Sequence, residues 1–265
     1  MVMKPGCQKR LVHRVCRNGS SDENNSGRRI VISFRKLSSD ENDPEISVNL
    51  NKSTAADYEE NSFQGPATKV TVIAGDSHTV GLNADKLGRK GKKTVVNLSE
   101  SGAKIGDVQK SLEKFCMSDE HANGKLVVEK VFISVGTNDI RNCLEKGTRS
   151  LNSPLLYLAE QVKLMFPDAV VWFQNMIPLP WQNKYTYSNV EEFNKIIMEV
   201  CRHAQTFYLD IFNEFLVYNP YYGFSYRHED LFIHSKNIHL NRLGLSILAR
   251  RYINLIHSSF NPLGY

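Results

Sequence analysis

Short apolar runs recur from residue 69 onward, and amphipathic stretches separate them. The runs are rich in Val, Ile and Phe and are apolar at consecutive positions, which is typical of strands buried on both faces of a parallel sheet. They fall at residues 70–74, 94–98, 131–135, 169–173 and 206–209. The sequence therefore predicts five parallel strands.

Four stretches between and after these runs space their apolar residues three or four positions apart, as on one face of an α-helix. Ser188 and Glu191 form a capping-box signature that predicts the start of the third helix. Asn241 is the expected N-cap of the last one. Strands that alternate with helices place the chain in the α/β class. We expect a three-layer α/β/α sandwich with a five-stranded parallel sheet and right-handed crossovers.

The first 68 residues lack this pattern. Gly, Ser, Asn and Asp dominate them, and such segments bury too little apolar surface to offset the entropy of ordering. Two β-prone runs, residues 30–34 and 46–50, leave a hairpin or an added edge strand open. We expect residues 1–68 to form a largely disordered tail and residues 69–265 to form the folded domain.

Charge is segregated within this tail. Residues 1–36 carry nine Lys or Arg against two acids, and residues 37–68 carry seven acids against one Lys. The basic arm, residues 1–36, is thus a candidate for nucleic-acid contact. A second basic cluster, residues 86–93, is expected to be a solvated turn, with phosphate binding as the alternative.

The sequence also bears on the compartment. No apolar run approaches the roughly 20 residues of a membrane span. The N-terminus lacks the apolar centre of a secretory signal. Five cysteines, an odd and small number, argue against a disulfide framework. We therefore expect a cytoplasmic or nuclear chain that is neither secreted nor bound to a membrane.

Chemically useful residues follow three predicted strands and precede the last helix. Ser77 follows the first strand, Gly102 the second and Asn138 the third, while His239 lies just before the final helix. The carboxyl ends of parallel strands form the working crevice of such a sheet. A serine nucleophile, a histidine base and N–H donors for an oxyanion are the groups that acyl transfer requires.

The order of these segments resembles the four blocks of SGNH (GDSL-like) hydrolases. Gly75-Asp76-Ser77 and Gly136-Thr137-Asn138-Asp139 carry most of the resemblance, which covers about residues 69–258. It implies the flavodoxin-like fold of that family and an esterase that needs no cofactor and no metal. Its substrate would be a small acyl ester such as an O-acetyl group. Ser77 would be the nucleophile and His239 the base. The Ser77 N–H, Gly102 and Asn138 would form the oxyanion hole.

A narrower likeness involves residues 101–108 and 239–241. These segments are similar to the esterase domains of LINE retrotransposon first-frame proteins and of related viral or domesticated genes.

One position departs from the family pattern. Family members place an Asp three residues before the histidine, and here Lys236 occupies it. Loss of the acid from a Ser-His-Asp triad typically costs about 10⁴-fold in turnover. Three interpretations stay open: a Ser-His dyad oriented by a backbone carbonyl, a substitute acid such as Asp230 or Glu229, or an inactive module in a nucleic-acid-binding or assembly protein.

Other residues receive plainer interpretations. His78 is expected to start a helix rather than to act as a second base. His234 and His239 have no companion ligands at zinc spacing, so no metal site is assigned. Two aromatic segments, residues 181–187 and 218–226, are expected to be loops that either line an acyl or sugar pocket or pack against the body.

Overall fold

The computed structural model describes residues 66–141, 147–179, 184–221, 224–234 and 237–259. The basic arm, the acidic segment and the two β-prone runs of the predicted tail lie outside these residues. Lys236 does as well. None of the helices described is long and apolar enough to cross a membrane.

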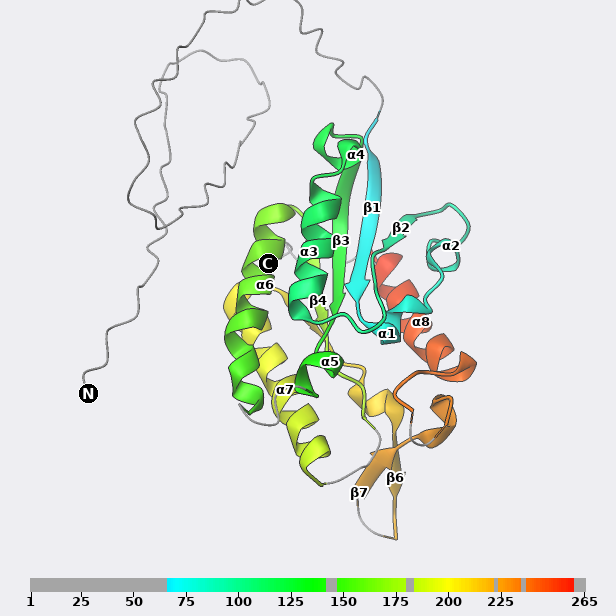
Figure 1. Ribbon diagram of the computed structural model, residues 1–265. Coiled ribbons are helices and arrows are strands. Elements are labelled where there is room, and N and C mark those ends of the chain that lie inside the picture. Colours follow the sequence, from blue (N-terminus) through cyan, green and yellow to red (C-terminus); the bar gives the residue numbers. More distant parts are fainter. Residues whose placement is uncertain (1–65, 142–146, 180–183, 222–223, 235–236, 260–265) are drawn as a thin grey trace, which may run out of the picture. The chain divides into compact units, whose positions relative to one another are not determined.

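A five-stranded parallel sheet forms the centre of the folded unit (Figure 1). The strand order is β2-β1-β3-β4-β5, which is the order of flavodoxin-like sheets. The strands are β1 (Thr68–Gly75), β2 (Thr94–Asn97), β3 (Leu126–Ser134), β4 (Val170–Gln174) and β5 (Phe207–Leu209). All five predicted strands and their parallel arrangement are confirmed.

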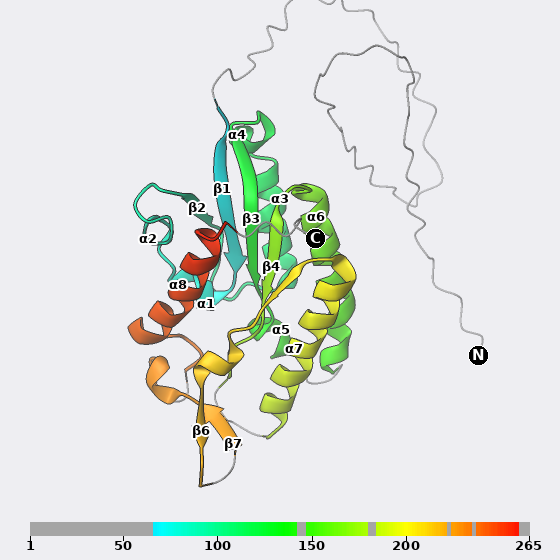
Figure 2. The ribbon, with the colours of Figure 1, turned by 180° about the vertical axis from the view of Figure 1, so that it is seen from behind.

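Helices cover both faces of this sheet (Figures 1 and 2). One face packs against α3 (Ile105–Cys116), α6 (Asn152–Met165) and α7 (Lys184–Ala204), and the other against α2 (Ala84–Leu87) and α8 (Arg242–Ile256). The short helices are α1 (Ser77–Val80), α4 (Asp119–Ala122), α5 (Thr137–Ile140), η1 (Thr148–Leu151), η2 (Phe212–Phe215) and η3 (Glu229–Leu231).

The two cores alternate along the central strands, because successive strand residues point to opposite faces. Val72 belongs to the core shared with α3, α6 and α7, while its neighbour Ile73 belongs to the core shared with α8. Val131 and Phe132 divide in the same way on β3. This arrangement confirms the predicted three-layer sandwich.

β3 begins earlier than the sequence predicts, because the charged residue Lys130 interrupts its apolar run. The Lys130 ammonium is nearly buried and donates to three carbonyls at the end of α8. The distances are 2.6 Å to Leu255, 3.2 Å to Ile256 and 3.0 Å to Ser258. A cation at a helix C-terminus satisfies carbonyls that have no partner within the helix.

Two local predictions fail and one is confirmed. α7 begins at Lys184, so the start predicted at Ser188 is wrong: the helix continues upstream of the capping signature. The segment 218–226, expected as a loop, lies largely in an antiparallel hairpin of β6 (Leu216–Asn219) and β7 (Phe224–Arg227). Asn241 caps α8 as predicted, and its Oδ1 accepts from the N–H groups of Leu243 and Gly244.

Candidate active site

The candidate nucleophile begins α1 directly after β1. A Cβ at Gly75 would lie 2.5 Å from Thr79 Oγ1 and 2.7 Å from the carbonyl oxygen of Ser134. Only glycine therefore lets the end of β1 lie this close to α1 and β3. Ser77 Oγ is shielded from solvent and has no hydrogen-bond partner among the described residues. An unpaired buried hydroxyl costs about 1–3 kcal/mol. Most buried polar groups in proteins are paired, and a catalytic role is one explanation for an unpaired one.

Asp76 and His78, on either side of Ser77, form a buried pair. Asp76 caps α1: its Oδ1 accepts from the His78 N–H at 3.0 Å and lies 3.1 Å from His78 Nδ1. Burial alone would raise the pKa of Asp76. The charge of a protonated His78 and hydrogen bonds from His78 and Thr137 outweigh burial and lower this pKa. The turn that presents Ser77 is therefore fixed from within the protein.

Asn138 and Asp139, in the segment after β3, bond to the segment after β2. Asn138 Nδ2 donates to the carbonyl of Ala103 at 3.0 Å. The two Asp139 oxygens lie 3.3 Å and 3.2 Å from the N–H of Ile105, at the start of α3. Burial raises the pKa of Asp139 to about 6, although the Ile105 N–H and the charge of Lys104 oppose the rise. These bonds set the loop of Gly102 beside Asn138.

Two glycines give these loops their shape. Gly102 has φ +83° and Gly136 has φ +119°, both in the region that favours glycine. A Cβ at Gly102 would meet nothing within 4 Å, so that position faces open space. A Cβ at Gly136 would lie 2.1 Å from the ring of Phe193. Within the described part of the chain, no hydrogen-bond partner is found for the N–H groups of Ser77 and Gly102.

His239 lies in a tight turn before α8. Its N–H donates to Asn237 Oδ1 at 2.8 Å, and its carbonyl accepts from Ile233 at 3.1 Å. The buried Arg227 donates through Nη2 to the Asn237 carbonyl, and its guanidinium lies 3.4 Å from the centre of the Phe232 ring. The His239 ring makes no hydrogen bond to any residue that the structure describes.

The turns of Ser77 and His239 meet through their neighbours. His78 Nε2 lies 3.0 Å from the carbonyl of Ile238, so the residue after Ser77 contacts the residue before His239. The sequence separation across this contact is 160 residues. The structure thus brings together all four segments that the sequence singled out.

The two suggested substitute acids have other contacts. Glu229 Oε2 lies 3.9 Å from Arg227 Nη2. Asp230 offers its backbone carbonyl to Asn241 at 2.7 Å. Within the described residues, no hydrogen bond or ion pair joins either carboxylate to His239, so their role as substitute acids stays a prediction. The described residues also contain no group of three or more His, Cys, Asp or Glu that could hold a metal.

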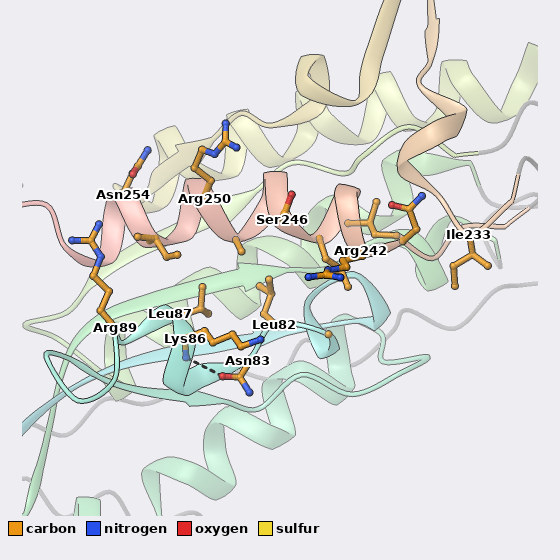
Figure 3. A pocket seen from close by; sticks show the side chains of 16 residues that line it. Leu82, Asn83, Lys86, Leu87, Arg89, Ile233, Arg242, Ser246, Arg250 and Asn254 are labelled. Carbon is orange, nitrogen blue, oxygen red and sulfur yellow. Dashed lines mark hydrogen bonds between the residues drawn. The ribbon is translucent and has the colours of Figure 1, made fainter.

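A groove of about 880 Å³ runs between α2 and α8 and includes neither Ser77 nor His239 (Figure 3). Its floor is aliphatic, and Lys86, Arg89, Arg242 and Arg250 stand along it. Two cations of the predicted basic turn therefore line a groove. Ser77 is also absent from a second hollow of about 490 Å³ beside Asn175 and Tyr208.

Sequence reasoning missed the contacts of His78 and Asp139. His78 does lie in the first turn of α1, as expected, but it is buried and bonded at both ring nitrogens. The available signal was a titratable residue directly beside the candidate nucleophile, Ser77. Asp139 belongs to the motif Gly136-Thr137-Asn138-Asp139, but its bond to Ile105 depends on how two loops meet.

Comparison with known proteins adds to this geometry. The family model described as the GDSL-like Lipase/Acylhydrolase family matches residues 63–246. A search of curated proteins found no match.

Solved structures share the fold at low sequence identity. One is a member of the lipolytic protein G-D-S-L family from Veillonella parvula, with 15% identity, TM-score 0.52, and coverage of 71% of this chain and 98% of that one. A variant of Axe2, an acetyl xylan esterase from Geobacillus stearothermophilus, has 14% identity, TM-score 0.53, and coverage of 74% and 97%. The acetyl xylan esterase AlAXEase has 15% identity, TM-score 0.53, and coverage of 69% and 96%.

Proposed function

Because the chain belongs to the GDSL-like lipase/acylhydrolase family, we propose that it is a serine esterase that works through an acyl-enzyme intermediate. One observation carries the proposal: the Ser77 hydroxyl is buried and unpartnered at a strand-to-helix turn that contacts the turn of His239. Because the Ser77 hydroxyl has no partner within the protein, it is free to interact with a base and a substrate carbonyl during the reaction.

The chemistry needs two steps. In the first, His239 takes the proton of Ser77 as Oγ attacks the ester carbonyl carbon. The N–H groups of Ser77 and Gly102 and the amide of Asn138 stabilise the oxyanion, and His239 then protonates the departing alcohol. In the second step, His239 deprotonates a water that attacks the carbonyl carbon of the acyl-enzyme. The bond to Ser77 Oγ then breaks, His239 returns the proton to Oγ, and the carboxylic acid is released.

We propose a small acyl group, such as acetyl, as the part that is transferred. Ser77 Oγ is shielded, and neither of the two hollows described above reaches it. Two structures with this fold are acetyl xylan esterases, which supports an acetyl ester as the first substrate class to assay.

A pair of serine variants tests the proposal. Ser77→Ala should abolish both hydrolysis of p-nitrophenyl acetate and labelling by a fluorophosphonate probe. Ser118→Ala is the matched control, because Ser118 Oγ is also buried and unpartnered yet lies before α4, away from the site. Labelling that persists in Ser77→Ala would reject Ser77 as the nucleophile.

A second candidate function belongs to another class. We propose as the alternative an inactive module of a nucleic-acid-binding or assembly protein, favoured by Lys236 in place of the family Asp and by the basic arm. Binding of a labelled single strand that weakens with salt and is lost on deletion of residues 1–36 would support it. A chain that hydrolyses esters and binds no strand at low salt would exclude it.

A further inference from the structure

His78 is the side chain that spans from the nucleophile's turn to the base's turn. It is 2% exposed, and each ring nitrogen has a partner. Nδ1 lies 3.1 Å from Asp76 Oδ1 and 3.3 Å from Thr137 Oγ1, while Nε2 lies 3.0 Å from the carbonyl of Ile238. A buried ring held at both ends has little freedom to move.

The partners decide which nitrogen carries a proton. A carbonyl oxygen only accepts, so Nε2 of His78 must carry the hydrogen that it shares with Ile238. Nδ1 faces one acceptor, Asp76, and one hydroxyl, Thr137, and both are buried. This leaves His78 as a donor toward the turn of His239 and rules it out as a base for Ser77 in this arrangement.

The other hydrogen bonds of the His239 turn come from nearby in the sequence, while the Ile238 side chain packs against the core shared with α3, α6 and α7. Arg227 donates to Asn237, Asn237 caps the N–H of His239, and Ile233 donates to the His239 carbonyl. These residues lie between the last residue of β7, Arg227, and the start of α8. The bond from His78 to Ile238 instead comes from α1, which carries Ser77.

We propose that His78 is a positioning residue that sets the place of His239 relative to Ser77, in a site whose sequence lacks the usual acid at Lys236. The inference rests on the proposed esterase function. The bond to Ile238 fixes the backbone directly before the base, so its loss lets the imidazole drift from the Ser77 hydroxyl. A misplacement of about 1 Å can cost about 10²-fold in rate.

Two substitutions separate this bond from the packing of the ring. In His78→Asn the amide nitrogen takes the place of Nδ1 beside Asp76, but the side chain is too short to reach Ile238. In His78→Gln the longer side chain brings an amide N–H to the place of Nε2. We expect the Asn variant to lose about 10²-fold in kcat with KM little changed, and the Gln variant to keep most of the wild-type kcat.

A double-mutant cycle distinguishes positioning from general stability. If His78 acts through His239, His78→Asn should slow fluorophosphonate labelling in the wild-type background and have no further effect in His239→Ala. Equal activity of the Asn and Gln variants, or an undiminished effect in His239→Ala, overturns the inference. A wild-type chain that neither labels nor hydrolyses esters overturns the proposed function itself, which is a distinct result.

A measurement on the unaltered chain does not depend on how the variants fold. In ¹⁵N-histidine spectra, His78 should show an Nε2–H proton that exchanges slowly with water, because the bond to Ile238 is shielded. A rapidly exchanging proton, or a ring protonated at Nδ1 alone, overturns the inference.

Discussion

The buried carboxyl of Asp139 should make stability depend on pH in a direction opposite to that of most carboxylates. Asp139 is 9% exposed, and burial raises its pKa from the ordinary value of 3.8 to about 6. Between these values the folded chain holds a proton that the unfolded chain has released. Stability from this group therefore falls as pH rises through the window, and the loss is complete above the folded pKa.

The size of the effect follows from the two pKa values. Between pH 4.5 and pH 7.5, a shift from 3.8 to about 6 lowers the free energy of unfolding by about 2 kcal/mol. Asp139→Asn removes the charge but keeps one oxygen that can accept from Ile105. The variant should therefore lack this pH-dependent loss.

Urea unfolding of both proteins at pH 4.5 and pH 7.5 measures the difference directly. The free energy of unfolding of Asp139→Asn minus that of the wild type should rise by about 2 kcal/mol from the lower to the higher pH. Asp85→Asn, at an exposed carboxylate on α2, is the matched control and should show a smaller change. A difference for Asp139→Asn that does not vary with pH would refute the reasoning.

Three further substitutions have defined outcomes. Gly136→Ala should destabilise the fold by about 3 kcal/mol in thermal or urea unfolding, because its Cβ would lie 2.1 Å from the Phe193 ring at φ +119°; an unchanged midpoint would contradict this. Lys130→Met should cost about 2 kcal/mol by removing the donor to three carbonyls at the end of α8, and an equally stable variant would show that water replaces it. Lys236→Asp should raise kcat for p-nitrophenyl acetate if His239 lacks an orienting acid, and an unchanged kcat would point to another orienting group.

The strands were predictable because burial on both faces leaves a strong signal in the sequence. Runs such as that around Val72 and Ile73 admit few other interpretations. β3 extends beyond its predicted start because Lys130 finds partners on α8, and no local pattern announces a partner more than a hundred residues away. The start of α7 was misplaced because a capping preference of about 1 kcal/mol does not decide where a long packed helix begins.

The same distinction between local and long-range interactions applies to the candidate site. The positions of Ser77, Gly102, Asn138 and His239 could be inferred from motifs, since each motif lies at the end of a predicted strand or before a predicted helix. The bonds that join these segments could not. The link from His78 to Ile238 depends on the mutual position of two loops, which a sequence pattern does not encode.

The placement of α8 has a consequence for chain synthesis. This helix, the last that the structure describes, covers Ile73 and Phe132 on the second face of the sheet, while Ser77 lies near the start of the same domain. A nascent chain that ends before α8 already contains Ser77 and His239, but it leaves Ile73 and Phe132 without this cover. Ribosomal pausing or truncation in this interval should favour aggregation and chaperone capture, because the apolar residues stay open until α8 docks.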